Sequence, residues 1–168
     1  MNRKIAGIGV VLTACAIFYS SSQPYVKQDM RSEISTVFEQ IPQCVTKSLE
    51  WISFCYAGKM VSIEALGVGG FIEFFIRKFA HIGAFFLLAF FLYCFLINGI
   101  EKRWKGRIYS FFLSALYAAS DEWHQGITGG RTPLIQDVGI DLFGSLLGIV
   151  VGILWMKKWK KIASYSTD

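Results

Sequence analysis

The stretch FAHIGAFFLLAFFLYCFLI, residues 79–97, decides the fold of this chain. It contains no charged residue and is interrupted only by His81, while Arg77 and Lys78 stand directly before it. A helix of about 20 mostly apolar residues is long enough to cross the hydrocarbon core of a bilayer. The stretch therefore predicts a membrane-spanning helix.

Three further runs have the same character: residues 5–22, 108–125 and 138–156. The run at residues 108–125 ends in polar residues from Asp121 to Gln125. The run at residues 138–156 carries Gly144, Gly148 and Gly152 at four-residue spacing, which lets a neighbouring helix approach closely. We expect an all-α integral membrane four-helix bundle, formed as a single domain over residues 1–168.

Composition supports a membrane protein and excludes other classes. The chain is 54% hydrophobic and only 17% charged, against about 25% charged residues in ordinary soluble domains. Its 16% aromatic content argues against disorder. The net charge of +5 comes from short basic clusters that flank the apolar runs, so no nucleic-acid surface is expected.

The first run has a second interpretation. A basic start at Arg3 and Lys4, a short apolar run and the small residues Ser20 to Ser22 also describe a signal peptide cleaved near that point. Because no charge follows until Lys27, we favour a retained helix.

The distribution of basic residues predicts the orientation. The N-terminus, the link at residues 98–107 and the tail from Lys157 together hold ten bases and two acids, whereas the other segments hold seven bases and ten acids. We therefore expect both termini of a multi-pass membrane protein in the cytoplasm, with the polar ends of spans two, three and four facing outward.

Residues 26–76 form the predicted extracytoplasmic segment between spans one and two. Ile34, Val37, Phe38 and Ile41 follow helical spacing, which predicts a short amphipathic helix that stops at Pro42. This helix either lies on the outer leaflet or caps the spans, and both possibilities stay open. Cys44 and Cys55 fall on this side, and whether they pair stays open as well.

Ionisable residues gather at one predicted depth on three helices. Because each costs roughly 2.5 to 3.5 kcal/mol at bilayer depth, they are expected to meet one another. Either a ligand site or a network that only locks the helices together fits this pattern. No metal-binding spacing such as HExxH is present, so neither a metal nor another cofactor is expected. The candidate ligand-binding residues are Arg77, Lys78, His81, Asp121, Glu122, His124, Gln125, Arg131, Asp137 and Asp141.

These residues carry a resemblance. The combination of Arg77, Lys78, Ala80 and His81 with the D-E-x-H-Q motif at residues 121–125, then Arg131, Asp137 and Gly144, is similar to the VanZ family of bacterial membrane proteins. The Ser-rich stretch at residues 18–24 resembles the exit from that family's first helix. The resemblance implies a four-helix envelope protein and a link to teicoplanin resistance. The chain departs from the family pattern at Ala84, Phe85 and Asp141, where members often carry an acid, a Tyr and an Asn.

Two functional classes follow. In the first, which we favour, the cluster binds an anionic or amphiphilic envelope molecule, such as a polyprenyl-phosphate lipid or a lipoglycopeptide, through Arg77, Lys78 and Arg131. In the second, the chain is an enzyme on a lipid headgroup, with His124 or His81 as the general base, Asp121 orienting it and Arg131 stabilising developing charge. Since no Ser or Cys stands in helical register with either His, a nucleophilic triad is not expected.

Overall fold

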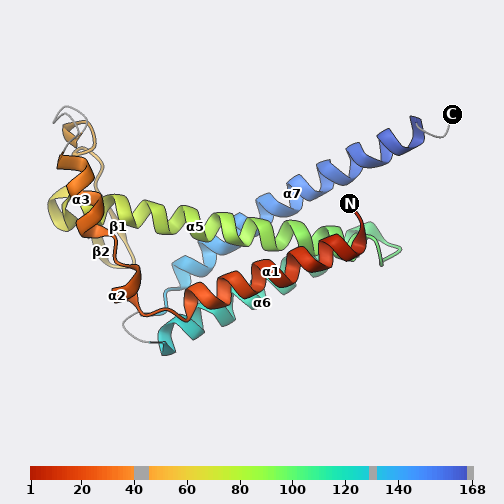
Figure 1. Cartoon of the computed structure of the whole chain (residues 1–168), viewed down its shortest axis with the longest axis horizontal. Helices are drawn as coiled ribbons and strands as arrows, with labels where there is room; N and C mark the ends of the chain where they lie inside the picture. Colours follow the sequence, from red (N-terminus) through yellow and green to blue (C-terminus); the bar gives the residue numbers. More distant parts are fainter. Residues whose placement is uncertain (40–45, 129–131, 166–168) are drawn as a thin grey trace. The chain divides into compact units, whose positions relative to one another are not determined.

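The computed structural model of the chain describes residues 1–39, 46–128 and 132–165, without the side chains of residues 159–165. Its elements in order are α1 (Arg3–Ser21), α2 (Tyr25–Gln28), α3 (Arg31–Glu39), β1 (Phe54–Tyr56), β2 (Lys59–Val61), α5 (Ile63–Ile97), α6 (Arg103–Ile127) and α7 (Ile135–Tyr165) (Figure 1). The protein is thus mainly helical.

Two compact units make up the structure. The first contains residues 1–23 and 81–168, and the second contains residues 24–80, so α5 contributes to both.

Helices α1, α5 and α7 are each long and apolar enough to cross a membrane. Helix α5 starts well before Phe79, because Ser62 caps its first turn by accepting a hydrogen bond from the Ala65 amide (3.1 Å). The helix is broken at Gly67, whose φ of 68° lies in the left-handed region that glycine tolerates.

Helix α6 has the length of a span but a different distribution of polar residues. Its buried face carries Gly106, Ser110, Ser114 and Ala118 at four-residue spacing, followed by Asp121, Glu122 and Gln125. Its exposed face carries large apolar residues, among them Phe112, Leu116, Trp123 and Ile127. This arrangement, polar inside and apolar outside, is the reverse of a soluble helix. It also explains why α6 is less apolar overall than the other three long helices.

The first unit is held together by close helix contacts. A Cβ added at Gly144 or Gly148 of α7 would overlap the carbonyl oxygens of Ile82 and Phe86 in α5. The predicted glycine row is therefore the surface on which α7 meets α5. Helix α1 packs along α6 (Figure 1), where the Tyr117 hydroxyl donates a hydrogen bond to the Ala14 carbonyl oxygen (2.7 Å).

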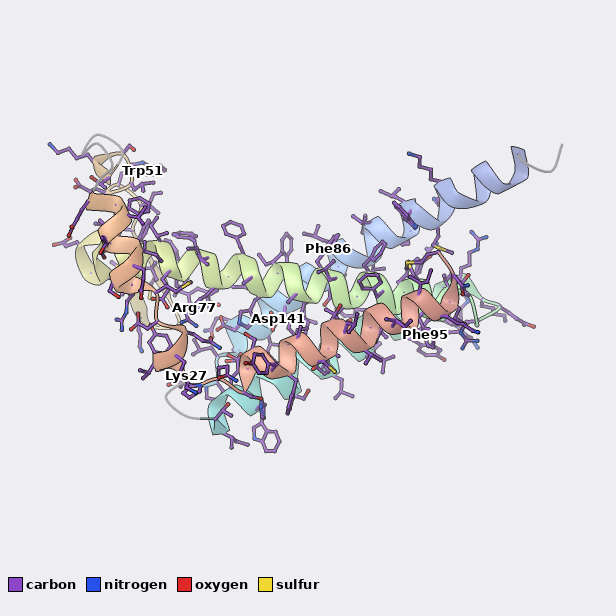
Figure 2. All side chains as sticks on the ribbon, in the orientation of Figure 1. Lys27, Trp51, Arg77, Phe86, Phe95 and Asp141 are labelled. Atoms are coloured by element: carbon purple, nitrogen blue, oxygen red, sulfur yellow. The ribbon has the colours of Figure 1, made fainter. Side chains whose placement is uncertain are left out.

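Two buried apolar clusters fill the first unit. One is built around Ala89, Tyr93 and Cys94 of α5, and the other around Phe85 and Leu88 with Ile17 and Ala118. Figure 2 labels Phe86 and Phe95 among the many aromatic side chains that α5 carries.

The second unit contains the amphipathic helix and a hairpin. Helix α3 covers the predicted stripe as far as Glu39, while Ile41, Pro42 and Cys44 lie outside the described residues, so the pairing of Cys44 with Cys55 stays a prediction. Strands β1 and β2 pair antiparallel, with Tyr56 opposite Lys59. Ala57 and Gly58 connect them with φ values of 50° and 78°, as a two-residue hairpin turn of right-handed twist requires.

Candidate functional site

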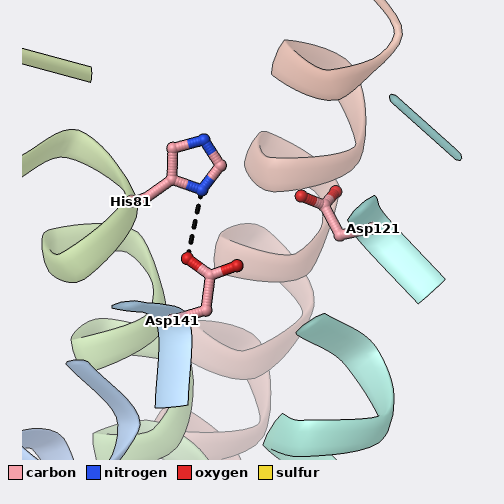
Figure 3. Close-up of side chains that lie close together, drawn as sticks. All are labelled: His81, Asp121 and Asp141. Carbon is pink, nitrogen blue, oxygen red and sulfur yellow. Dashed lines mark hydrogen bonds and ion pairs between the residues drawn. The ribbon is translucent and has the colours of Figure 1, made fainter. Parts of the chain in front are cut away.

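Three polar side chains from three helices meet inside the first unit. His81 comes from α5, Asp121 from α6 and Asp141 from α7, and one ligand atom from each lies within 4.8 Å of the other two (Figure 3). His81 Nδ1 and Asp141 Oδ1 are 3.1 Å apart and share a hydrogen bond. We call these three residues the His–Asp–Asp cluster. All three are among the ten residues that the sequence predicted for the site.

Both carboxylates of the cluster are buried. The exposed fraction is 0% for Asp141 and 5% for Asp121, and 23% of the His81 side chain is exposed. Gln125 donates a hydrogen bond from Nε2 to Asp121 Oδ2 (2.7 Å), which fixes that carboxylate one turn along α6. By contrast, Asp141 Oδ2 is buried and has no hydrogen-bond partner in residues 1–39, 46–128 or 132–158. A buried acceptor left unpaired costs about 1–3 kcal/mol, so this oxygen is an unusual feature of the cluster.

Glu122 ties the end of α6 to the start of α7. The amide of Leu134 donates a hydrogen bond to Glu122 Oε1 (2.6 Å), across the connection that contains Arg131. Within the part of the chain that the structure describes, its other oxygen, Oε2, is buried without a hydrogen-bond partner, as is Asp141 Oδ2. Asp137 is half-buried in the first turn of α7. Arg131 itself lies outside the described residues.

His124 faces a different neighbour. Its ring stacks on Phe18 of α1, with centroids 4.8 Å apart, and its Nε2 lies 3.1 Å from Ser22 Oγ. The Ser22 hydroxyl already donates its single hydrogen to the Phe18 carbonyl oxygen (2.7 Å), so it accepts from the imidazole. A serine in this state is not activated for nucleophilic attack. The pair holds α1 against α6 instead.

Ser21 strengthens the same junction. Its hydroxyl receives a hydrogen bond from Gln125 Nε2 (3.2 Å), and its carbonyl oxygen receives one from the Thr128 hydroxyl (3.0 Å). Sequence reasoning did not include Ser21 or Ser22 among the site residues. The available signal was that this Ser-rich exit from the first span lies at the same predicted depth as Asp121 to Gln125.

Arg77 and Lys78 belong to the second unit, where each has neighbours of its own. Arg77 Nε donates to Glu73 Oε1 (2.7 Å), and Nη2 donates to the Gln28 carbonyl oxygen (2.7 Å). Glu73 is 2% exposed. Lys78 Nζ lies over the Tyr56 ring, 4.6 Å from its centroid. Sequence reasoning missed Glu73, although its spacing of four residues from Arg77 was a usable signal.

A second arginine shares the Glu73 carboxylate. Arg31 Nε lies 3.7 Å from Glu73 Oε2, and Arg31 also binds Asp29, which accepts from Arg31 Nε at 2.9 Å. These hydrogen bonds with Arg31 lower the pKa of Asp29 to about 2. The second unit therefore contains an ion-pair network of Asp29, Arg31, Glu73 and Arg77.

Comparison with known proteins gives one informative match. No curated protein and no solved structure matches the chain. A family model described as VanZ/LLP1 matches residues 8–156, which include every residue of the His–Asp–Asp cluster.

Proposed function

Because this multi-pass membrane protein belongs to the VanZ/LLP1 family, we propose that it binds an anionic or amphiphilic molecule of the bacterial envelope and thereby lowers susceptibility to lipoglycopeptide antibiotics such as teicoplanin. The candidate ligands are a polyprenyl-phosphate lipid and the lipoglycopeptide itself, and the carboxylates of the cluster favour the second, because a phosphate offers acceptors rather than donors. The binding site is the His–Asp–Asp cluster with Gln125 and Glu122 around it.

One observation carries the proposal: two buried carboxylate oxygens, Asp141 Oδ2 and Glu122 Oε2, have no hydrogen-bond partner among the residues that the structure describes. A network that served only to lock helices together would gain about 1 kcal/mol for each such oxygen it satisfied. Buried oxygens without a hydrogen-bond donor at one end of the bundle favour a ligand that supplies donors, or a bound cation. Hydroxyl and ammonium groups of an amphiphilic headgroup are such donors.

The proposed placement of the site puts it near the outer leaflet. Helix α6 exposes Phe112, Leu116 and Trp123 and buries its polar face, which supports a fourth span in contact with lipid. The basic segments at the N-terminus, at residues 98–107 and after Lys157 support cytoplasmic termini. With four spans, the ends of α5, α6 and α7 that carry the cluster share the extracytoplasmic side, where envelope ligands are found.

A second candidate function has one observation in its favour. His81 is held by the Asp141 carboxylate at 3.1 Å, the arrangement that orients a general base. In an enzyme acting on a lipid headgroup, His81 is thus the base and Asp141 its orienting partner. His124 is the weaker candidate because it stacks on Phe18 and bonds Ser22.

The experiment measures teicoplanin susceptibility of a bacterial host that expresses the chain, with membrane levels checked by immunoblot. We expect Asp141→Asn and His81→Gln to abolish the protection at unchanged membrane levels, while the matched amide exchange Asp29→Asn, in the second unit, retains it. Full protection by Asp141→Asn would overturn the assignment of the site. Equal teicoplanin susceptibility of the host that expresses the chain and of the host with an empty vector would overturn the antibiotic function. Release of inorganic phosphate from a purified lipid phosphate, lost in His81→Gln, would select the enzyme instead.

A further inference from the structure

The His–Asp–Asp cluster has the donor set of a metal site. It offers one imidazole nitrogen and two carboxylates, which are ligands that Zn²⁺ and Mn²⁺ accept. From these residues we propose that His81, Asp121 and Asp141 bind one divalent transition-metal ion between α5, α6 and α7. The expectation from sequence was no metal, because each helix contributes a single ligand and no local spacing motif arises.

The distances allow such an ion with small side-chain movements. The three ligand atoms lie within 4.8 Å of one another, so one point lies at most 4.8 Å divided by √3, or about 2.8 Å, from all three. Zinc bonds to nitrogen and oxygen measure about 2.0–2.2 Å. Each ligand atom therefore moves inward by less than about 1 Å to reach bonding distance. Rotation of the side chains supplies a movement of this size.

The charges of the cluster favour a cation. Asp121 and Asp141 are both buried, so their negative charges repel each other in a medium of low dielectric constant. Within the described residues, neither carboxylate is ion-paired with a Lys or Arg, and His81 is the single ion-pairing partner of Asp141. A divalent cation balances two carboxylates and a neutral imidazole.

The unpartnered oxygen is the independent observation that points to a ligand. Asp141 is 0% exposed, and its Oδ2 has no hydrogen bond from any described residue, while Oδ1 contacts His81. In Figure 3 the carboxylate of Asp141 lies below His81, with one oxygen joined to the imidazole and the other on the side of Asp121. A metal ion bound to Oδ2 gives this buried oxygen a partner and removes the free-energy cost of leaving it unpaired.

The surroundings of the ligands fit a metal site as well. Gln125 donates to Asp121 Oδ2 at 2.7 Å and so orients a ligating carboxylate, as outer-shell partners of metal ligands do. Three protein ligands leave one position of a tetrahedral ion open, the feature that separates metal sites that bind other molecules from purely structural ones. An anionic headgroup can coordinate there. The cluster is the same as that of the proposed function, but the metal inference depends only on its geometry and is tested without the antibiotic.

The test is zinc binding to the purified full-length chain in detergent, freed of any affinity tag and stripped with a chelator. Thiols are alkylated first, because exposed Cys15 and Cys55 would otherwise bind zinc on their own. We expect one zinc ion per chain by elemental analysis and calorimetry. Asp141→Asn and His81→Gln should each weaken binding at least about tenfold, since they remove a ligand rather than an outer-shell partner. The matched control His124→Gln removes the other imidazole and should leave the affinity unchanged.

Two outcomes overturn the inference. One is absence of bound zinc and manganese from the wild-type chain. The other is equal zinc affinity in wild type, Asp141→Asn and His81→Gln, which would show adventitious binding only. Where a variant does not fold, thermal unfolding of the wild type decides: saturating zinc or manganese should raise the melting temperature, and no rise with either rejects the site. Zinc binding in a chain without antibiotic phenotype keeps the metal site and rejects the proposed function. The reverse result rejects the metal site alone.

Discussion

Gly148 of α7 lies directly against Phe86 of α5, so that a Cβ at this glycine would overlap the Phe86 carbonyl oxygen. The overlapping atom belongs to the backbone and cannot move aside as a flexible side chain can. The helices must therefore separate to admit any larger residue at this position.

We therefore expect Gly148→Leu to destabilise the first unit by about 3 kcal/mol, the upper part of the range for an overpacked core. Thermal unfolding in detergent measures this. Gly83→Ala in α5 is the matched control, because the space around Gly83 is open and alanine is the better helix former by about 0.5–1 kcal/mol. Equal stability of Gly148→Leu and wild type would show that α7 does not pack on α5 through this glycine.

The two histidines should respond differently to the same substitution. His124→Phe keeps a ring to stack on Phe18 and loses the hydrogen bond with Ser22, a loss of about 0.6 kcal/mol for such bonds in membrane proteins. His81→Phe leaves Asp141 without its hydrogen-bond partner and should cost about 1–3 kcal/mol. Comparing the melting temperatures of the two variants checks this. A larger loss for His124→Phe would contradict the assigned roles.

Glu73 should be the residue on which the ion-pair network depends. Glu73→Gln removes the buried carboxylate that pairs with Arg77 at 2.7 Å and leaves the guanidinium without its charge partner. Removal of one member of a buried pair costs about 3–5 kcal/mol, and we expect the lower end because 22% of the Arg77 side chain is exposed. Asp29→Asn, at the exposed end of the network, should change stability little. Limited proteolysis of the second unit distinguishes the two variants, and equal cleavage rates would argue against the network.

The Asp29 carboxylate should stay ionised at unusually low pH. Its pKa is lowered to about 2, mainly by the hydrogen bonds from Arg31, against an ordinary value of 3.8. A lowered carboxylate pKa stabilises the folded state above the unfolded value, and that contribution is lost as the pH falls from about 4 towards 2. A carbon-13 NMR titration of the aspartate carboxyls, with Asp29→Asn to identify the signal, reads the midpoint. A midpoint near 4 would mean that the Arg31 contact does not form.

Single cysteines placed in a chain without native cysteines test the four spans. A membrane-impermeant maleimide should label Lys47→Cys and Thr132→Cys on intact cells, and Lys102→Cys and Lys158→Cys only after permeabilisation. The pair of Lys102 and Thr132 brackets α6 and therefore reports whether this helix crosses the bilayer. Labelling both from the same side would remove the fourth span, and labelling Lys158→Cys from outside would reverse the orientation.

The sequence alone determined the three long apolar helices that can cross a membrane. Charge-free runs such as residues 79–97 cannot satisfy their backbone in lipid except as helices, so their conformation follows from composition. The spacing of Gly144, Gly148 and Gly152 likewise predicted a close helix contact, and that contact exists with α5. The resemblance to the VanZ family, carried by local motifs, is confirmed by the match over residues 8–156.

Only the tertiary structure decided which polar residues meet. A helix turns about 100° per residue, so Asp121 and His124 point about 60° apart, which is enough to direct one towards Asp141 and the other towards Phe18. Sequence spacing fixes such angles within a helix, but it does not say which helix stands on which side. For the same reason the contact of Arg77 with Gln28, 49 residues away, was not foreseen, whereas Glu73 stands four residues from Arg77 on the same helix and could have been predicted. The neighbours of a polar residue in this protein depend on how separate helices pack, and that packing is set by side-chain shape across long sequence distances.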